Sequence, residues 1–531
     1  MKYSFLFIFI FAISFGYSQS TTLGLLYSNG EASPGYTLFT PEKSTSAFLI
    51  NNCGEIINDW WFTELPGATC YLLENGNILR AGKDSLEIRD WDSNLIWSYP
   101  TTNNGLNQHH DIHPMPNGNI LLVVSDEYTQ HEVITMGRDA SITDLNFKFD
   151  KIVEIQPIGT NDADIVWEWR FVDHLIQYFD SNQQNYGIVE DHPELLDVNY
   201  DNGQIFDWVH LNAVEYNAEK DQVLITARHL SEIYIIDHST TTEEAAGHSG
   251  GNSDKGGDFL WRWGNPAVYR QGTTEDQKLK WPHDAKWVKE SYEDEGKISV
   301  FNNNFDGEGS ESFVHLIEPV VNGYSYSMSN NIFLPETYYW SFGGELLGST
   351  LFSEKKSGTH SLPNGNIMIC EYDRSIIFEI TKDGSLVWAY RNPVGNVVYN
   401  QYEEHTSSTV GIFRGEKYPP DYPGFDGKDL TPQGLLENQN PVSNQCIFVS
   451  IDNKQLESCD FSICNPIMDS KIQFNKTICA ELIKIIDLQG KIHQTEFDFN
   501  DKQLNVDLKP GLYLLQIFQN EYIYTLRIVV K

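Results

Sequence analysis

Apolar residues alternate with polar ones in many short runs along the chain, and no long segment repeats them at helical spacing. Several of these runs are separated by Asn-Gly turns, as in "LLENGNILRAG", "MPNGNILLVV" and "LPNGNIMICEY". An Asn-Gly pair between alternating apolar residues is a strong signal for a β-hairpin. The pattern therefore predicts a chain built from short antiparallel strands.

A second pattern is a strand-like segment that ends in tryptophan, as in "DIVWEWRF", "DFLWRWGNP" and "SLVWAYRNP". Three or four short strands per unit, repeated in this way, are typical of a β-propeller. A β-sandwich needs fewer strands, and a β-helix has a shorter and more uniform period. We therefore predict six blades, one for each marker tryptophan: Trp60, Trp97, Trp167, Trp261, Trp340 and Trp388.

The ring of blades needs a closure that hides its two open sheet edges. The stretch "TSSTVGIFRGEKYPPDYPGFDG", after the last tryptophan unit, offers a strand without a partner. We expect this strand to complete the first blade.

The character of the chain changes after about residue 440, where a compact all-β module with regularly spaced turns begins. We expect a propeller domain over residues 21–440, a linker over 441–456, and a small β-sandwich-like domain over 457–531. The fold class is therefore all-β throughout.

The N-terminal segment "MKYSFLFIFIFAISFGYSQS" has one lysine, an apolar run, and then small and polar residues. This order predicts a secretory signal peptide over residues 1–20. No later stretch approaches the ~18 continuous apolar residues of a membrane span, so we expect no integral membrane segment in the mature chain. Four of the seven cysteines follow residue 440, where disulfides suit an exported protein.

The chain is strongly acidic, with 36 Lys+Arg against 74 Asp+Glu and a net charge of −38. Such a field repels nucleic acid and anionic membrane surfaces, which excludes them as expected partners. An anionic substrate then needs a local basic pocket.

Polar residues that interrupt the apolar hairpins indicate where such a pocket lies. In "HLNAVEYNAEKDQVLITARH", a loop that pairs Tyr216 with Gln222 places His210 opposite Arg228. Asn212 is two residues further along and is expected on the same face. These three side chains all carry hydrogen-bond donors.

The same procedure places a histidine in the two flanking hairpins. In "QHHDIHPMPNGNILLVVSDE", pairing Pro116 with Asn119 sets His110 opposite Ser125, although the sequence leaves open whether His109 or His110 faces the channel.

The third hairpin, "WPHDAKWVKESYEDEGKISVFNNNFDG", brings His283 near Asn303. If these hairpins carry the innermost strands, three imidazoles surround a central channel.

Two kinds of chemistry suit three histidines and an arginine. Neutral imidazoles can hold zinc or manganese with an open position, but a fixed cation such as Arg228 beside a dication is unfavourable. In the alternative, a histidine nitrogen attacks an anionic group while the other donors neutralise its oxygens. The absence of a Walker-type loop disfavours magnesium-dependent phosphoryl transfer. We therefore expect group transfer without metal or cofactor.

The motifs "HHDIHPMPNGNILLV", "DWVHLNAVEYNAEKDQVLITARH" and "WPHDAKWV" resemble bacterial arylsulfate sulfotransferases over roughly residues 50–435. The resemblance implies a six-bladed propeller that moves a sulfuryl group from a phenolic sulfate donor to a phenolic acceptor by a ping-pong mechanism. It also implies a sulfohistidine intermediate on His283. The residues then expected to bind the sulfuryl group or substrate are His110, His210, Arg228, Asn212 and Asn303.

The C-terminal module resembles the sorting domain of type IX secretion substrates. The matching features are "IIDLQGK", "LKPGLYLLQI" and the basic final residue Lys531. This resemblance implies export through the periplasm to the cell surface or medium, with the type IX machinery as a partner.

Two other function classes remain open at this point. One is a secreted polysaccharide lyase or hydrolase with a metal at the three histidines, and the other is a non-catalytic binding propeller. Metal analysis separates the first from sulfotransfer. The sequence identifies neither donor nor acceptor, and it leaves the oligomeric state and disulfide pairing open.

Overall fold

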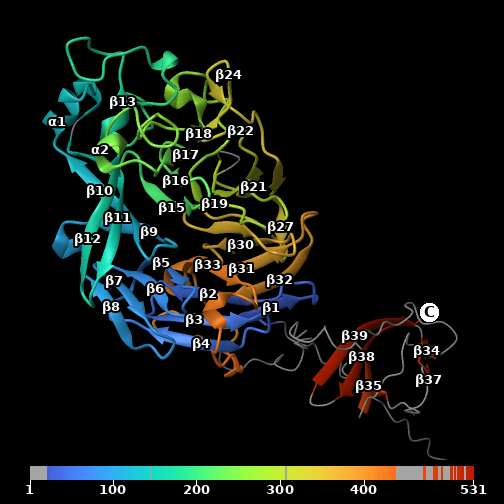
Figure 1. Ribbon diagram of the computed structural model, residues 1–531. Coiled ribbons are helices and arrows are strands. Elements are labelled where there is room, and N and C mark those ends of the chain that lie inside the picture. Colours follow the sequence, from blue (N-terminus) through green and yellow to red (C-terminus); the bar gives the residue numbers. More distant parts are fainter. Residues whose placement is uncertain are drawn as a thin grey trace, which may run out of the picture. The chain divides into compact units, whose positions relative to one another are not determined.

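The computed structural model describes residues 21–143, 145–304 and 308–437, and towards the C-terminus residues 471–473, 482–487, 492–493, 503–505, 508–509, 511–519 and 522–530. The expected signal peptide and linker lie outside the described residues. Contacts divide the chain into two units, Met1–Gln445 and Cys446–Lys531. Both units consist of β-sheets, and the few helices are short (Figure 1).

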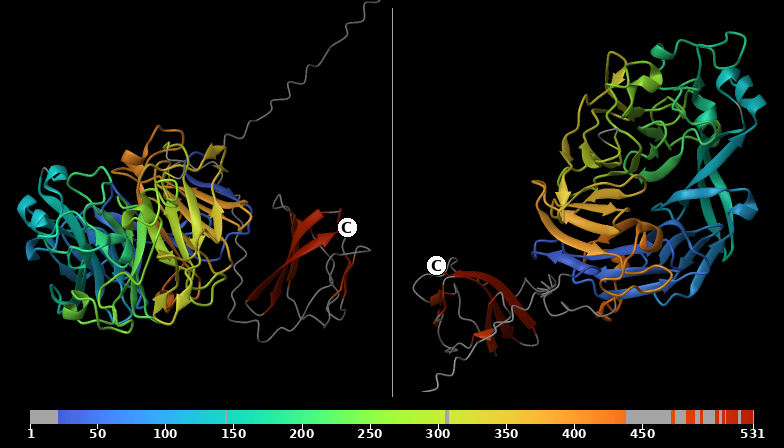
Figure 2. Two further views of the ribbon diagram at one scale, coloured as in Figure 1. Left: turned by 90° about the horizontal axis from the view of Figure 1, so that it is seen from above. Right: turned by 180° about the vertical axis from the view of Figure 1, so that it is seen from behind.

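The first unit has a propeller-like arrangement of antiparallel sheets, which confirms the predicted all-β class. Its colours run in chain order from blue through green to orange in each view (Figures 1 and 2). Three of its sheets have four strands each. They are formed by β33 (Ile412–Tyr418), β2 (Tyr36–Pro41), β3 (Ser46–Asn51) and β4 (Ile56–Trp61); by β15 (Leu211–Asn217), β16 (Gln222–Ala227), β17 (Glu232–Asp237) and β18 (Trp261–Trp263); and by β19 (Pro282–Trp287), β20 (Ile298–Asn302), β21 (Phe313–Ile317) and β26 (Trp340–Phe342).

The larger sheets extend the same pattern. An eight-stranded sheet contains two antiparallel series of four strands, which a single parallel pairing of Ala68 with His110 joins. A five-stranded sheet follows the sheet of β19. The eight strands are β5 (Pro66–Leu72), β6 (Ile78–Gly82), β7 (Leu86–Arg89), β8 (Leu95–Tyr99), β9 (Gln108–Pro114), β10 (Ile120–Tyr128), β11 (Phe147–Ile158) and β12 (Asp162–Arg170), and the five are β29 (Gly358–Ser361), β30 (Ile367–Glu371), β31 (Ile376–Ile380), β32 (Leu386–Arg391) and β1 (Gly24–Ser28).

Two late strands pair with early ones and so close the first unit. β33 lies antiparallel to β2, with Tyr418 opposite Tyr36, and this is the closure predicted from the sequence. β1 adds a second closure, which the sequence did not suggest, by pairing with β32. Both contacts cover edges that would otherwise be open to pairing with another chain.

The hairpin turns follow the Asn-Gly signals. Gly76, Gly118 and Gly365 have positive φ angles of 81°, 87° and 82°, a conformation that glycine adopts without steric cost. The described residues also contain short elements in the loops. These are β13 (Leu175–Ile176), β14 (Leu196–Asp197), β22 (Val321–Asn322), β23 (Ser325–Tyr326), β24 (Met328–Ser329), β25 (Ile332–Phe333), β27 (Glu345–Leu346), β28 (Ser349–Thr350), α1 (Gln130–Thr135), α2 (Thr242–Ala245), α3 (Ser407–Val410) and the 3₁₀ turns Thr102–Asn104, Ala140–Ile142, Phe171–His174, Val189–Asp191, Pro266–Tyr269 and Pro423–Phe425.

The marker tryptophans connect neighbouring sheets. Each lies in the fourth strand of its series and donates its indole N–H to a residue before, or at the start of, the fourth strand of the next series. The last of these bonds returns from β32 to the end of β3. The pairs, at 2.7–3.2 Å, are Trp60 with Asp90 O, Trp97 with Asp162 O, Trp167 with Thr240 Oγ1, Trp261 with Leu334 O, Trp340 with Lys382 O, and Trp388 with Asn52 O.

The first strand of each series lies at the centre of the unit. β33, β5, β9, β15, β19 and β29 contact one another in this order, and β29 contacts β33 again (Figure 1). The three hairpins with predicted site histidines begin with β9, β15 and β19, so these histidines lie on or beside inner strands.

The second unit contains a four-stranded sheet and a separate strand pair. The described strands support an all-β module, while the sandwich-like packing stays a prediction. The sheet consists of β36 (Ile492–His493), β35 (Leu482–Asp487), β38 (Gly511–Gln519) and β39 (Tyr522–Val530), and the pair consists of β34 (Lys471–Gln473) and β37 (Gln503–Asn505).

Candidate active site

Each inner strand that contains or adjoins a predicted site histidine also contains a β-bulge. Bulges insert extra residues into one strand and re-aim side chains, often next to functional sites. The bulges show as register shifts between Leu122 and Val124 opposite β9, between Leu211 and Ala213 in β15, and between His283 and Lys286 in β19.

The predicted pairing of His210 with Arg228 is confirmed, because Arg228 N donates to His210 O at 3.0 Å. The predicted register of the turn is wrong by one residue, since Tyr216 pairs with Val223 rather than with Gln222. The extra residue of the bulge restores the expected pair.

The predicted pairing of His110 with Ser125 is wrong. Ser125 N instead donates to Asn107 O at 3.0 Å. The turn already differs from the prediction, because Met115 N bonds to Asn119 O, and the β9 bulge then shifts the register further.

The backbone around the histidines is held in the left-handed region. His110 and His210 have φ angles of 59° and 54°, and Trp281 and Asp284, which flank His283, have φ angles of 57° and 56°. For residues other than glycine this conformation costs on the order of 1–3 kcal/mol each, and such strain concentrates at functional sites.

His110, rather than His109, lies against His210. The ring centroids of His110 and His210 are 4.7 Å apart, whereas those of His109 and His210 are 6.5 Å apart. His109 turns towards Asp150, with Nε2 2.9 Å from Oδ1. Burial, followed by the neighbouring His109 and His210, lowers the pKa of His110 well below its usual value, so this imidazole is neutral.

Asp207 is a site residue that the sequence analysis missed. Its Oδ2 lies 2.6 Å from His210 Nδ1, and its Oδ1 lies 3.0 Å from Lys148 Nζ. Burial favours a raised pKa for Asp207, but His210 and Lys148 outweigh it and hold the pKa below its usual value. The carboxylate position depends on the backbone, because Lys148 N donates to Phe206 O at 2.8 Å. The only signal in the sequence is the aspartate three residues before His210.

Arg228 places an unneutralised guanidinium at the site. Its Cζ lies 4.9 Å from the centroid of the Trp281 ring, and its Nη1 lies 2.7 Å from His229 Nε2. Arg228 Nε has no hydrogen-bond partner among the described residues. Burial lowers the pKa of Arg228, yet an arginine remains a cation at neutral pH.

His283 has its tautomer fixed by its neighbours. Nδ1 lies 2.7 Å from Asn303 Oδ1 and 3.1 Å from Trp281 O, while Nε2 accepts from Lys356 N at 3.1 Å. Because both oxygens can only accept, Nδ1 carries the proton and Nε2 carries the lone pair. Burial, followed by Arg228, lowers the pKa of His283 well below its usual value and keeps the ring neutral.

The two predicted asparagines are both engaged within the protein. Asn303 Nδ2 donates to Ser353 O and Lys356 O at 2.9 and 3.0 Å, and its Oδ1 accepts from His283. These contacts orient His283, and the expected role of Asn303 in substrate binding stays a prediction. Asn212 Nδ2 donates to Pro282 O at 2.8 Å, and its Oδ1 has no partner within the described part of the chain.

A cluster of charged residues lies beside the histidines on the same strands. Arg414 Nη1 donates to Asp111 Oδ2 at 2.6 Å, Arg414 Nε lies 3.1 Å from Asp284 Oδ1, and Arg414 Nη2 donates to Asn212 O at 2.6 Å. Lys286 pairs with Glu416. Burial favours a lowered pKa for Arg414, but Asp111 and Asp284 outweigh it and raise the pKa. This cluster joins β9, β15, β19 and β33.

Comparison with known families decides the family of the chain. The model of the family described as Arylsulfotransferase (ASST) matches residues 36–372. The chain belongs to the arylsulfotransferase family. Membership supports aryl sulfotransferase activity in general. A second model, the Secretion system C-terminal sorting domain, matches residues 465–531 and indicates export by type IX secretion, with that machinery as a partner.

Searches of individual proteins add little to this assignment. No curated protein matches the chain. Solved structures that resemble it include a protein of unknown function from Bacteroides caccae (12% identity, TM-score 0.37, covering 72% of this chain and 99% of that one). Another is virginiamycin B lyase from Staphylococcus aureus with quinupristin (9% identity, TM-score 0.33, covering 70% and 88%). These TM-scores are too low to support an argument.

One other observation fits export. Cys53 is disulfide-bonded, as oxidising compartments permit. Within the described residues, the helices are all too short or too polar to cross a bilayer.

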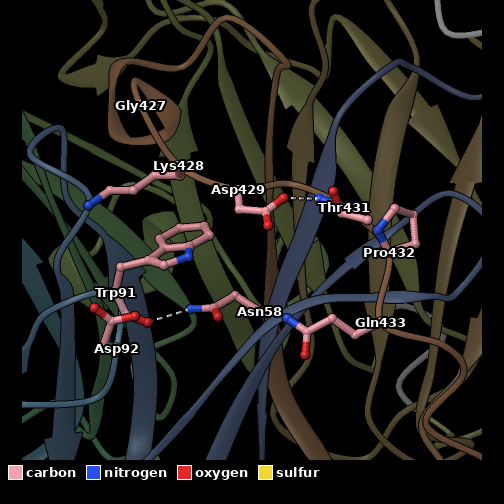
Figure 3. A pocket seen from close by; sticks show the side chains of 9 residues that line it. All are labelled: Asn58, Trp91, Asp92, Gly427, Lys428, Asp429, Thr431, Pro432 and Gln433. Atoms are coloured by element: carbon pink, nitrogen blue, oxygen red, sulfur yellow. Dashed lines mark hydrogen bonds between the residues drawn. The ribbon is translucent and has the colours of Figure 1, made fainter.

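Two pockets differ in their relation to the histidines. One of about 340 Å³ is lined by Trp281, which stacks on Arg228, and by Phe352 and Glu354. The larger pocket, of about 600 Å³, lies between Asn58 and Trp91 on one side and residues 427–433 on the other (Figure 3). None of the site histidines lines either pocket, and the smaller one adjoins the site through Trp281.

His210 also belongs to a set of three residues that could bind a metal ion, and this set differs from the three-histidine site expected from the sequence. The ligand atoms of Asp207, His210 and His229 lie within 4.8 Å of one another. Both nitrogens of His229 are already engaged, with Arg228 Nη1 at 2.7 Å and Asp207 O at 2.6 Å. The adjacent guanidinium makes this group a poor site for a dication.

Proposed function

We propose that this chain transfers a sulfuryl group from a phenolic sulfate to a phenolic acceptor by a ping-pong reaction, with His283 as the nucleophile. The observation that carries the proposal is the fixed tautomer of His283, whose Nδ1–H faces Asn303 Oδ1 and whose Nε2 bears the lone pair. A buried neutral imidazole held in this way needs no deprotonation before it attacks.

In the first half-reaction His283 Nε2 forms a bond to the donor sulfur, and the bond from sulfur to the phenolic oxygen breaks. The phenolate leaves with the bonding electron pair and takes up a proton. In the second half-reaction an acceptor phenol loses its proton, its oxygen attacks the sulfur, and the N–S bond breaks. The Nε2 lone pair is then restored, so neither oxidant nor cofactor is consumed.

The surrounding donors are suited to stabilise negative charge on the sulfuryl oxygens. Arg228 supplies a fixed cation with an unpartnered Nε, and His210 supplies an imidazole whose Nδ1 is held by the carboxylate of Asp207. His110 lies against His210 and completes the cluster. Preorganised donors of this kind account for a large share of enzymatic rate enhancement.

Lys356 has a specific place in this proposal. Its backbone N–H occupies His283 Nε2 at 3.1 Å, so the incoming sulfur must displace that hydrogen bond. The freed N–H is then placed to donate to a sulfuryl oxygen.

We also propose that the first unit is a six-bladed propeller over about residues 21–440, followed by the linker and the sorting domain over 457–531. The six indole bonds between successive series of strands support the count, because the sixth returns from Trp388 to Asn52. The single parallel pairing of Ala68 with His110 supports treating the eight-stranded sheet as two blades.

The decisive experiment uses the donor alone. Purified protein mixed with a chromogenic aryl sulfate is expected to release a burst of one phenol per chain and to leave an acid-labile adduct on the peptide containing "WPHDAKW". His283→Ala is expected to lose both the burst and turnover. The matched control, His192→Ala, removes an exposed histidine that is 47% accessible and is expected to keep both.

Two results would contradict the assignment. An unmodified His283 in an active enzyme saturated with donor would exclude the covalent route. An adduct on His110 or His210 would assign the nucleophile to another ring.

A further inference from the structure

We propose that His174, His248 and Asp258 form a structural zinc site that holds residues 241–258 against β12. The ligand atoms of these three residues lie within 4.8 Å of one another. His174 ends the 3₁₀ turn Phe171–His174, which directly follows β12, while His248 and Asp258 come from the segment between β17 and β18. The cluster therefore joins two neighbouring series of strands at their outer strands, away from the inner strands that carry the active site.

The geometry brings two imidazole nitrogens to one carboxylate oxygen. His174 Nδ1 and His248 Nδ1 each lie 2.8 Å from Asp258 Oδ1. Tetrahedral zinc with bonds of about 2.0–2.1 Å holds its ligand atoms about 3.3 Å apart. An outward movement of about half an ångström therefore admits the ion.

The hydrogen bond of His174 Nε2 to a backbone carbonyl leaves its other nitrogen as the possible metal ligand. His174 Nε2 lies 2.8 Å from Ala245 O, and a carbonyl oxygen can only accept, so Nε2 carries a proton. Nδ1, which lies 2.8 Å from Asp258 Oδ1, is then the nitrogen of His174 that can bind a metal. A metal-bound histidine has this same arrangement, with its other N–H donated to a backbone carbonyl.

The surroundings of His174 are built to hold it in place. The side chain is 0% exposed and stacks on Trp169, whose ring lies 5.5 Å away at an angle of 5°. Trp169 Nε1 donates to Gly257 O at 2.7 Å. A Cβ at Gly257 would lie 2.6 Å from His174 Nε2 and 2.0 Å from Ala245 O, so this close approach requires glycine.

The ligand set selects the kind of metal. Two imidazole nitrogens and one carboxylate suit zinc, whereas calcium and magnesium prefer oxygen ligands alone. His248, whose side chain is 61% exposed, lies at the solvent side, where water can complete a tetrahedral set. Among the described residues no arginine or lysine side chain bonds to its ligands, whereas Arg228 bonds to His229 in the other group.

The test measures zinc uptake by the full chain after removal of metal with a chelator. Wild-type protein titrated with Zn²⁺ alone is expected to bind one ion per chain and to gain thermal stability as zinc is added. His248→Ala is expected to weaken binding by roughly a hundredfold or more and to abolish the stabilisation by zinc. Its exposed side chain contributes little packing, so the variant is expected to fold.

A matched variant distinguishes this site from the active-site group. His229→Ala removes a ligand of the other metal-competent group and is expected to leave zinc uptake unchanged. Zinc that is lost in His229→Ala and kept in His248→Ala would overturn the proposal. So would wild-type protein that takes up no zinc at micromolar concentrations, because the cluster would then be an ion pair between imidazolium and carboxylate only.

Discussion

Arg228, which is half-buried, and Arg414, which is buried, lie near the centre of the same unit and differ in what surrounds them. Arg414 lies between Asp111 and Asp284, which neutralise it. Arg228 stacks on Trp281 and bonds to a histidine, and its Nε has no partner among the residues described. Arginine therefore has two roles in this unit: Arg414 is neutralised by carboxylates of the protein, whereas Arg228 is not.

The pKa directions express the same difference. The pKa of Arg414 is raised because its two carboxylates outweigh burial, whereas the pKa of Arg228 is lowered because burial outweighs its more distant acidic neighbours. A cation whose counter-charge is built into the fold stabilises the fold. A cation without one is held ready for an anionic ligand, and this suits a transferred sulfuryl group.

The largest expected effect is the loss of stability in Arg414→Met. The substitution leaves Asp111 and Asp284 buried without their cation, and breaking a buried ion pair in this way costs about 3–5 kcal/mol of unfolding free energy. Urea unfolding at neutral pH measures the loss. Arg270→Met is the control, because Arg270 is 37% exposed in its pair with Asp197 and is expected to cost less than about 1 kcal/mol.

The deficit of Arg414→Met is expected to depend on pH. Burial already raises the pKa of Asp284, and removal of Arg414 takes away a group that lowers it. A carboxyl whose pKa is higher in the folded state binds more protons there, so stability is gained as pH falls through that pKa. The deficit should therefore be smaller at pH 5 than at pH 7, and a deficit that grows on acidification would contradict this account.

Arg228→Met is expected to show the opposite combination. Its stability should stay close to that of the wild type, while sulfuryl transfer slows by about a hundredfold, the equivalent of about 3 kcal/mol for one preorganised charge. Stopped-flow measurement of the donor burst tests the rate. A variant that loses stability without losing rate would remove the distinction between the two arginines.

The pH profile of this variant gives a second measurement. Burial and then Arg228 lower the pKa of His283, so removal of the guanidinium raises that pKa. Because a protonated His283 cannot attack, the acid limb of kcat/KM should move to higher pH in Arg228→Met. An unchanged acid limb would mean that another group sets it.

The sequence predicts the parts of this molecule that depend on local patterns. Alternating residues and Asn-Gly turns predict the hairpins, and the strand without a partner near residue 412 predicts the closure with β2. The pairing of His210 with Arg228 is right although the turn register is wrong, because the bulge at Asn212 adds the missing residue. Bulges leave no clear signal in a single sequence, and this explains the failure for His110 and Ser125.

Contacts between distant segments are beyond such reasoning. Arg414 lies in a strand that was predicted, but its partners Asp111 and Asp284 are about 300 and 130 positions away. Asp207 reaches His210 only because residues 206–208 pair with β11 at Lys148. The Asn303 amide is similarly directed by the backbone carbonyls of Ser353 and Lys356. Each of these depends on the tertiary fold rather than on spacing.

Asp207→Asn has the smallest expected effect. It tests whether the carboxylate of Asp207 contributes to sulfuryl transfer through its hydrogen bond with His210. The amide oxygen can still accept from His210 Nδ1, now 2.6 Å from the carboxylate, but the negative charge beside His210 is lost. We expect sulfuryl transfer to slow by about tenfold, or about 1.4 kcal/mol, with the burst still one phenol per chain. Asp221→Asn is the matched control, since Asp221 Oδ1 lies 2.6 Å from Nδ1 of His238, which is not one of the site histidines. A loss of rate as large as that of His283→Ala would mean that Asp207 takes part in the reaction itself. An unchanged rate would mean that His210, like Arg228, needs no carboxylate beside it.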